Sequence, residues 1–275
     1  MNNTPPSIPV PLPPPFAVGR TAEIYAWQEG TILKLYRDWC PPNWVDHEAR
    51  IAAVVNQAGL PAPRAFDIVE VNGRRGLVYE RVDGDSMMQE MLRQPLELPR
   101  YGRILADLHL EMHCQSAPTL PSQHSQLEHS ISNAKDLPDD LRAAALQALA
   151  RMPDGDRLCH GDFHPENVLM TVRGALIIDW MTANRGNPWA DVARTHLLLT
   201  IGQTPARINI FMRTLILFGR RTFYGAYMKR YQASAPEGKQ QLQAWIPIMA
   251  AARINEEIAN EQQALLAIVT AGLKA

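Results

Sequence analysis

The chain has 275 residues, of which 46% are hydrophobic and 20% charged, and its formal net charge is -1. This composition is typical of a globular protein with one large domain or two lobes. The near-neutral charge argues against a nucleic-acid-binding protein, because such a protein needs a basic face to displace the counterions of the phosphates.

The first fifteen residues, "MNNTPPSIPVPLPPP", contain neither the basic start nor the apolar core of a signal peptide. Their prolines predict a disordered, extended arm over residues 1–15. The three cysteines are widely spaced, so we expect no disulfide framework and a cytoplasmic location. The most apolar stretch, "INIFMRTLILFG", is shorter than the roughly 20 residues that a membrane-spanning helix needs. We therefore expect no membrane partner.

Residues 16–82 predict mainly antiparallel strands. The alternating runs "AEIYAW" and "TILKLY" form one expected hairpin. The runs "AFDIVEV" and "RGLVYERV" form a second, because Asn72-Gly73 suits a type I′ turn. Between the hairpins, "NWVDHEARIAAVVNQAGL" predicts a helix that Asn43 can cap and Gly59 can end.

Residues 83–275 show mainly helical periodicity, for example in "YGRILADLHLEMH", "PDDLRAAALQALARM" and "PWADVARTHLLL". Two long helices are expected toward the C-terminus, with a bend at Pro247. The exception is "NVLMTVRGALIIDW", which predicts two short strands around a turn. The sequence therefore predicts an α+β protein with a small lobe over 16–82 and a larger, mainly helical lobe over 83–275.

The segment "LCHGDFHPENVL" is unusually polar for a stretch that leads into a strand. Cys159, His160 and His164 could bind zinc, but a structural zinc site usually needs four ligands and no second pair follows. Gly161 and Pro165 could instead form a polar turn without any chemistry. This segment alone leaves both alternatives open.

The spacing of the polar residues favours a third interpretation of this segment, as a catalytic loop. Asp162 follows His160-Gly161, Asn167 comes five residues later, and Asp179 comes after the predicted hairpin. The catalytic loop of protein kinases and its following metal-binding Asp have this order. Phosphoryl transfer needs a carboxylate beside the attacking hydroxyl, which fits Asp162. It also needs hard oxygen ligands for Mg²⁺, which fits Asn167 and Asp179.

"HGDFHPEN" together with "IIDWMTANRGNPWADVA" resembles the aminoglycoside phosphotransferase and choline kinase superfamily. The resemblance implies a two-lobed, protein-kinase-like fold that uses ATP and Mg²⁺ to phosphorylate a hydroxyl of a small molecule. The acceptor would be aminoglycoside-like, an amino-alcohol or a sugar. The resemblance also implies that Lys34, held by Glu48, places the phosphates. The remaining nucleotide contacts would come from a turn and a hinge, namely Gly19, Arg20, Thr21, Glu80 and Val82.

Several polar residues near these motifs have two interpretations. We expect Asp191 to brace the catalytic loop through backbone hydrogen bonds. We expect His164 either to touch substrate or phosphate or only to pack. Glu257 and Glu261 are four residues apart, which would place them on one helical face. They would then either bind a cationic acceptor or form a solvated surface stripe.

Two other functions remain as alternatives. One is a pseudokinase-like module that binds nucleotide without turnover. The other is a true protein kinase, against which stand Gly161 in place of arginine and Trp180-Met181 in place of Phe-Gly. The sequence predicts no particular oligomeric state.

Overall fold

The computed structural model describes residues 7–8, 11–201, 210–236 and 238–273, and the chain divides into two compact units. The first comprises Met1–Asp85 and Leu169–Met181, and the second comprises Ser86–Val168 and Thr182–Ala275. The predicted small lobe covers residues 16–82, and the first unit also contains Leu169–Met181. Among the described residues, no helix is both long and apolar enough to cross a membrane.

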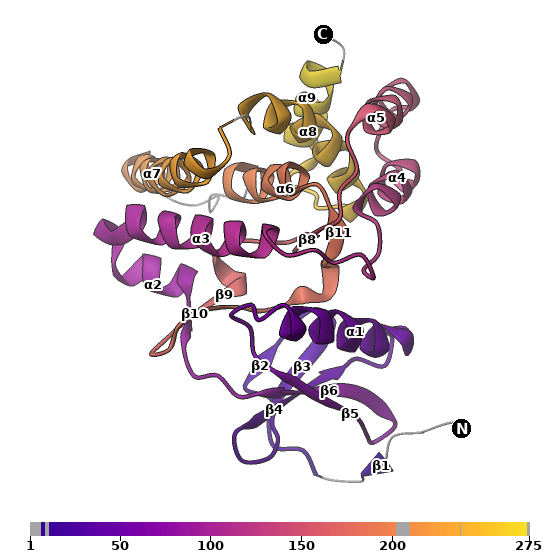
Figure 1. Ribbon diagram of the computed structural model, residues 1–275, viewed down its shortest axis with the longest axis vertical. Coiled ribbons are helices and arrows are strands. Elements are labelled where there is room, and N and C mark those ends of the chain that lie inside the picture. Colours follow the sequence, from indigo (N-terminus) through magenta and orange to yellow (C-terminus); the bar gives the residue numbers. More distant parts are fainter. Residues whose placement is uncertain (1–6, 9–10, 202–209, 237, 274–275) are drawn as a thin grey trace. The chain divides into compact units, whose positions relative to one another are not determined.

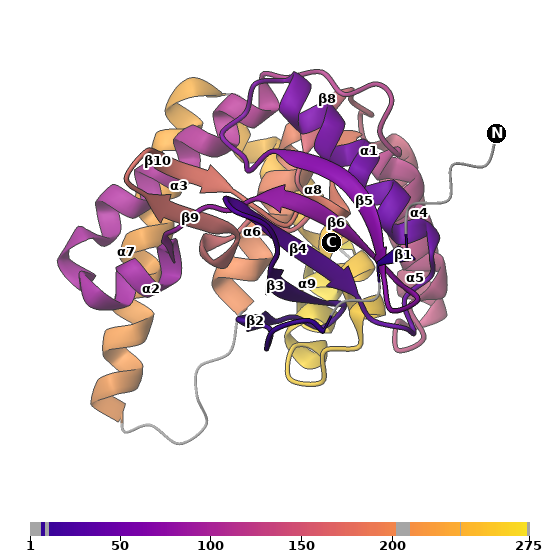
Figure 2. The ribbon, with the colours of Figure 1, turned by 90° about the horizontal axis from the view of Figure 1, so that it is seen from below.

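The first unit contains a six-stranded sheet in the order β1-β5-β6-β4-β3-β2 (Figure 2). Its strands are β1 (Ser7–Ile8), β2 (Ala17–Val18), β3 (Ala22–Ala26), β4 (Thr31–Tyr36), β5 (Ala65–Val71) and β6 (Arg74–Glu80). Both predicted hairpins are present, and Asn72 and Gly73 have φ values of 52° and 77°, as a type I′ turn requires. The predicted arm differs at Ser7–Ile8, which pairs in parallel with β5. Residues 1–6 and 9–10 of the arm lie outside the described residues.

The two faces of this sheet have different roles. Leu33 and Leu35 of β4 are fully buried and pack with apolar residues of β3, β5 and β6. Lys34 and Tyr36 alternate with them, so they lie on the other face, beside α1 (Asn43–Gln57). Helix α1 begins at Asn43, which makes no side-chain capping hydrogen bond, so the predicted cap is wrong.

The second unit is mainly helical (Figure 1). Its helices are α2 (Met87–Arg93), α3 (Leu98–His113), α4 (Gln123–Asn133), α5 (Asp139–Arg151), α6 (Pro188–Ile201), α7 (Ile210–Ser234), α8 (Gly238–Arg253) and α9 (Gln262–Leu273). Helix α8 contacts α6 and α9, while α3 packs along α7. At Gly102 of α3, a side-chain carbon would lie 2.5 Å from the carbonyl oxygen of Phe223 on α7. The close packing of these two helices therefore requires glycine at this position.

Short elements position the polar motifs. They are η1 (Pro95–Glu97), η2 (Pro165–Asn167), η3 (Trp180–Thr182), η4 (Ile254–Glu256), β7 (Asp85–Ser86), β8 (Arg157–Cys159), β9 (Val168–Thr171), β10 (Gly174–Ile177) and β11 (Asn184–Gly186). Strands β8 and β11 pair antiparallel, and β9 and β10 form the predicted hairpin. Pro247 lies inside α8, which continues to Arg253. Helix α7 corresponds to one of the two long helices predicted toward the C-terminus, and residues 202–209 before it lie outside the described residues.

Candidate active site

The polar segment after β8 forms a tight loop in the second unit. Gly161 has a φ of 78°, and a side-chain carbon there would lie 2.6 Å from the carbonyl oxygen of Thr182. Only glycine fits both conditions. Nδ2 of Asn167 donates a hydrogen bond to the carbonyl oxygen of Asp162, five residues earlier, at 2.9 Å. The loop is thereby closed on itself, with Asp162 and Asn167 at its two ends.

Basic groups hold the carboxylate of Asp162 in its charged form. Nη2 of Arg194 donates a hydrogen bond to it at 3.2 Å, and Nε2 of His164 lies 3.5 Å away. Burial opposes the charge, but the hydrogen bond with His164 and the charge of Arg194 outweigh burial and hold the pKa of Asp162 well below its usual range. The side chain is still 32% exposed, so a hydroxyl group can reach an ionised carboxylate here.

The zinc alternative for this loop is not supported. In the part of the chain that the structure describes, Cys159, His160 and His164 do not gather around a common point. Cys159 is fully buried, and burial raises the pKa of its thiol, whereas zinc binds the thiolate.

Asp191 of α6 accepts hydrogen bonds from the backbone of the loop. Its Oδ2 accepts a hydrogen bond from the backbone N–H of His160 at 2.7 Å, and its Oδ1 accepts one from Gly161 at 2.9 Å. Asp191 is fully buried. The bracing role that the sequence predicted for this residue is therefore confirmed.

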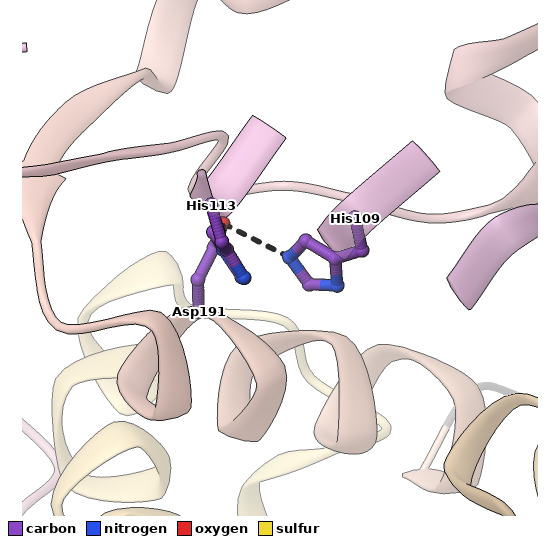
Figure 3. Close-up of side chains that lie close together, drawn as sticks. All are labelled: His109, His113 and Asp191. Carbon is purple, nitrogen blue, oxygen red and sulfur yellow. Dashed lines mark hydrogen bonds and ion pairs between the residues drawn. The ribbon is translucent and has the colours of Figure 1, made fainter. Parts of the chain in front are cut away.

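Two histidines of α3 complete the surroundings of Asp191 (Figure 3). Nε2 of His109 and of His113 lie 3.2 and 3.3 Å from Oδ2 of Asp191. Nδ1 of His109 lies 2.7 Å from the hydroxyl of Tyr227, and Nδ1 of His113 lies 2.7 Å from the hydroxyl of Tyr231. Both tyrosines belong to α7. The two histidines and the aspartate have the chemistry of metal ligands. Every ring nitrogen and both carboxylate oxygens already have hydrogen-bond partners, so hydrogen bonding explains the cluster without an ion.

This cluster makes the stability of the protein dependent on pH. Burial, reinforced by the neighbouring His113, lowers the pKa of His109 to about 3. In the unfolded chain the same ring titrates near the usual value of about 6.5. Between these two values the unfolded state binds one more proton, so acidification costs about 1.4 kcal/mol of stability per pH unit.

We therefore expect His109→Gln to flatten the fall of the unfolding free energy between pH 6 and pH 5. Urea unfolding at both pH values measures it. The matched control is His129→Gln, which alters an exposed histidine of α4 and should keep the slope of the wild type. An unchanged slope in His109→Gln would contradict the assignment of the proton to His109.

A second polar cluster lies within the first unit, on the face of the sheet that α1 covers. Nζ of Lys34 lies 2.8 Å from Oε1 of Glu48 and 3.1 Å from Oδ1 of Asp179. Glu48 is 2% exposed and also accepts hydrogen bonds from the hydroxyls of Tyr36 and Tyr79. Burial opposes the charge of Lys34, but Glu48 and Asp179 outweigh it and raise the pKa of the ammonium group. The expected contact between Lys34 and Glu48 is thus present, and the two tyrosines were not predicted.

Glu48 should therefore matter more for stability than any of its partners. Glu48→Ala removes the acceptor of three donors and leaves them buried, so we expect a loss of about 3 kcal/mol. Tyr79→Phe removes one hydrogen bond and should cost about 1 kcal/mol. Urea unfolding at pH 7 compares the two. A smaller loss in Glu48→Ala than in Tyr79→Phe would contradict the central position of the carboxylate.

Asp179 has an unusual backbone. Its φ is 60°, in the left-handed region that residues other than glycine rarely adopt and that Asp and Asn tolerate best. Its side chain is 54% exposed although one oxygen contacts Lys34. Unusual backbone conformations of this kind are concentrated at functional sites.

The predicted nucleotide turn and hinge also lie in the first unit. The N–H of Gly19 donates to the carbonyl of Ala22 at 2.9 Å and closes the turn between β2 and β3, which carries Arg20 and Thr21. Glu80 ends β6, and its N–H donates to the carbonyl of Arg64 at 2.8 Å. Val82, two residues further on, is half-buried.

The predicted acidic face at the C-terminal end is wrong. Helix α8 ends at Arg253, and Glu257 has a φ of 54°, so a left-handed turn separates it from Glu261 and interrupts the helix. Glu257 is exposed and lies 3.1 Å from Nζ of Lys135. Glu261 is 6% exposed and accepts two hydrogen bonds from Arg253, at 2.7 and 3.0 Å.

Comparisons with known proteins identify the family. Residues 14–245 match the model of the phosphotransferase enzyme family. The chain belongs to this family. A search of curated proteins returned no match. Several solved structures are similar to this chain over most of its length.

One similar structure is a thermostable mutant of the aminoglycoside phosphotransferase APH(4)-Ia in complex with AMP-PNP and hygromycin B. It has 16% identity and a TM-score of 0.66, and the match covers 94% of this chain and 92% of that one. An aminoglycoside-3'-phosphotransferase of type VIII has 20% identity and a TM-score of 0.58, with coverage of 88% and 90%. A choline/ethanolamine kinase family protein from Mesorhizobium loti has 15% identity and a TM-score of 0.54, with coverage of 97% and 89%.

These identities are low, so the likeness to the solved structures establishes the fold. The expected protein-kinase-like α+β fold, with an antiparallel sheet in the N-terminal part and a helical C-terminal part, is confirmed. Membership of the phosphotransferase enzyme family indicates a phosphotransferase that acts on small molecules.

Proposed function

We propose that this chain transfers the γ-phosphoryl group of ATP to a hydroxyl of a small molecule, namely an aminoglycoside-like compound, an amino-alcohol or a sugar. The observation that carries the proposal is the setting of Asp162, which is partly exposed, paired with Arg194 and attached to a loop whose backbone donates two hydrogen bonds to Asp191. We place the reaction in the cytoplasm, with no nucleic-acid or membrane partner.

In this proposal Asp162 orients the acceptor hydroxyl and accepts its proton. Most of the catalytic effect comes from positioning and charge neutralisation, for which a rigid loop is an advantage because it needs no rearrangement during the reaction. His164, whose ring lies 3.5 Å from the carboxylate, is close enough to contact the acceptor or the phosphate.

The residues of the first unit would bind the nucleotide. Lys34, held by Glu48, would contact the phosphates, and backbone N–H groups of the turn from Gly19 to Thr21 would support them. The N–H of Glu80 is already bonded to Arg64, so the carbonyl of Glu80 and the N–H of Val82 would meet the edge of the adenine.

Asn167 and Asp179 have the donor set that Mg²⁺ prefers. Nδ2 of Asn167 is bonded to the carbonyl of Asp162, so its amide oxygen is the atom left to offer. Asp179 offers a half-exposed carboxylate. Both ligands are hard oxygens, without thiol or imidazole. When bound, Mg²⁺ would neutralise negative charge on the phosphates.

The test is a coupled assay of ADP formation from ATP and Mg²⁺ with aminoglycosides, choline, ethanolamine and sugars. Mass spectrometry of the acceptor should show the addition of one phosphoryl group. ATP binding without turnover of any acceptor would instead support the pseudokinase alternative. Phosphorylation of a protein substrate in preference to every small molecule would contradict the proposal.

A further inference from the structure

A cavity of about 150 Å³ lies in the second unit, directly beside the catalytic loop. Gly161 of the loop lines it, and so does Arg194, whose guanidinium donates to the carboxylate of Asp162. The rest of its wall comes from α4, η3, β11, α8 and η4. Sites for drug-sized ligands measure roughly 300–1,000 Å³. The cavity is therefore suited to one ring or one short chain.

Among the described residues, the charged side chains that line this cavity are two arginines and one carboxylate, and all three are already paired. Glu256 is the only carboxylate among the described residues that line it. It accepts hydrogen bonds from Arg194 and, at 2.9 Å, from Arg253. The two arginines reach further carboxylates, Asp162 for Arg194 and Glu261 for Arg253. An ammonium group that entered the cavity would face these two arginines and compete with them for carboxylates that are already paired, whereas an uncharged hydroxyl would not.

One lining residue has a buried acceptor without a partner. Asn184 of β11 is 4% exposed, and among the described residues its Oδ1 has no hydrogen-bond partner. Its Nδ2 donates to the carbonyl oxygen of Thr182 at 3.2 Å and to Oε1 of Gln126 at 3.1 Å. A backbone carbonyl can only accept, so this contact fixes which side of the amide carries the nitrogen. The described residues provide no donor for Oδ1, and a hydroxyl of a molecule bound in the cavity that Asn184 lines can supply one.

The other lining groups fit the same kind of molecule. Ser130 and Gln126 of α4 add polar atoms, and Leu127 and Met249 add apolar surface. A polyol or a sugar ring presents the matching mixture, with hydroxyl groups at its edge and carbon atoms on its faces.

We propose that the acceptor is a small, uncharged, hydroxyl-rich molecule, such as a monosaccharide or cyclitol, and that one of its hydroxyls donates to Oδ1 of Asn184. The proposal rests on the proposed function. A second hydroxyl oxygen of the same molecule forms the bond to the γ-phosphorus and passes its proton to Asp162. The bond from the γ-phosphorus to the bridging oxygen breaks, and its electron pair leaves with ADP.

The test compares matched acceptors with the wild-type protein, ATP and Mg²⁺. The uncharged set is glucose, galactose and myo-inositol, and the cationic set is glucosamine, galactosamine and kanamycin. We expect the best uncharged acceptor to exceed its amino counterpart in kcat/KM by at least about tenfold. A cationic acceptor that ranks first would overturn this inference and leave the proposed function intact. No transfer to any member of either set, or to any acceptor of the wider panel, would overturn both.

Variants of Asn184 test the role of its oxygen. Asn184→Leu should raise the KM of the best uncharged acceptor by at least about tenfold without changing the KM of ATP. Asn184→Asp adds a carboxylate and should shift the preference toward the amino sugar. Because Asn184 is buried, a second variant covers the case in which Asn184→Asp does not fold. Ser130→Asp adds a carboxylate to the same cavity and then provides a second test of the shift in preference toward the amino sugar. Asn133→Asp, on an exposed position of α4, is the control and should change neither the KM of the acceptor nor the preference between uncharged and amino sugars. Unaltered acceptor KM in Asn184→Leu would overturn the assignment.

Discussion

Asp162→Asn is expected to lower kcat by a factor of at least about 100, which is the scale of a positioned acid–base group. The substitution keeps the size of the side chain and its ability to accept the hydrogen bond from Arg194, but an amide cannot take up the proton of the acceptor. ATP binding should not change, because we assign the nucleotide contacts to the first unit.

Calorimetry with ATP and the coupled ADP assay separate these two effects. Asp67→Asn, at an exposed position of β5, is the matched control and should retain full activity. Near-normal turnover by Asp162→Asn would remove the carboxylate from the mechanism. Normal turnover together with weaker ATP binding would reassign Asp162 to nucleotide binding.

Asp179→Asn should weaken the binding of ATP in the presence of Mg²⁺ by at least about tenfold. Asparagine tolerates the left-handed backbone at this position, so the change removes the negative charge with little strain. In EDTA, ATP should bind the variant at least as well as it binds the wild type, because Lys34 loses a competing carboxylate. Calorimetry with and without Mg²⁺ measures both effects.

Asn167→Ala provides the comparison for this prediction. An amide oxygen does not neutralise charge as a carboxylate does, so its loss should reduce the effect of Mg²⁺ less than the loss of Asp179. If the wild type and Asp179→Asn depend equally on Mg²⁺, Asp179 is not a metal ligand. A larger effect from Asn167→Ala would reverse the order of the two proposed ligands.

The parts of the site that could be predicted from the sequence are those set by local geometry. Strand alternation placed Lys34 on the opposite face from Leu33 and Leu35. Its contact with Glu48 was expected from the family resemblance. The bracing contact of Asp191 with the backbone of the loop was also expected, but its two partners, the N–H groups of His160 and Gly161, come from the structure.

The missed parts depend on contacts between distant segments. No local pattern marks Arg194 as a partner of Asp162, 32 residues away in the sequence. The segment "RINEEIANEQQALL" has no proline or glycine, so it reads as one helix. The structure shows a turn there, and the buried pair of Arg253 and Glu261 spans it. Propensity alone does not reveal such a tertiary contact.

The close contact of α3 with α7 at Gly102 has a consequence for the evolution and engineering of the enzyme. Helix α3 carries the two histidines beside Asp191, and α7 carries the tyrosines that hold them. A larger residue at Gly102 would push the helices apart about two turns before His109. Selection on the shape of the catalytic loop therefore acts on small residues that never meet a substrate. Libraries that randomise only the surroundings of Asp162 would not sample these remote determinants of its geometry.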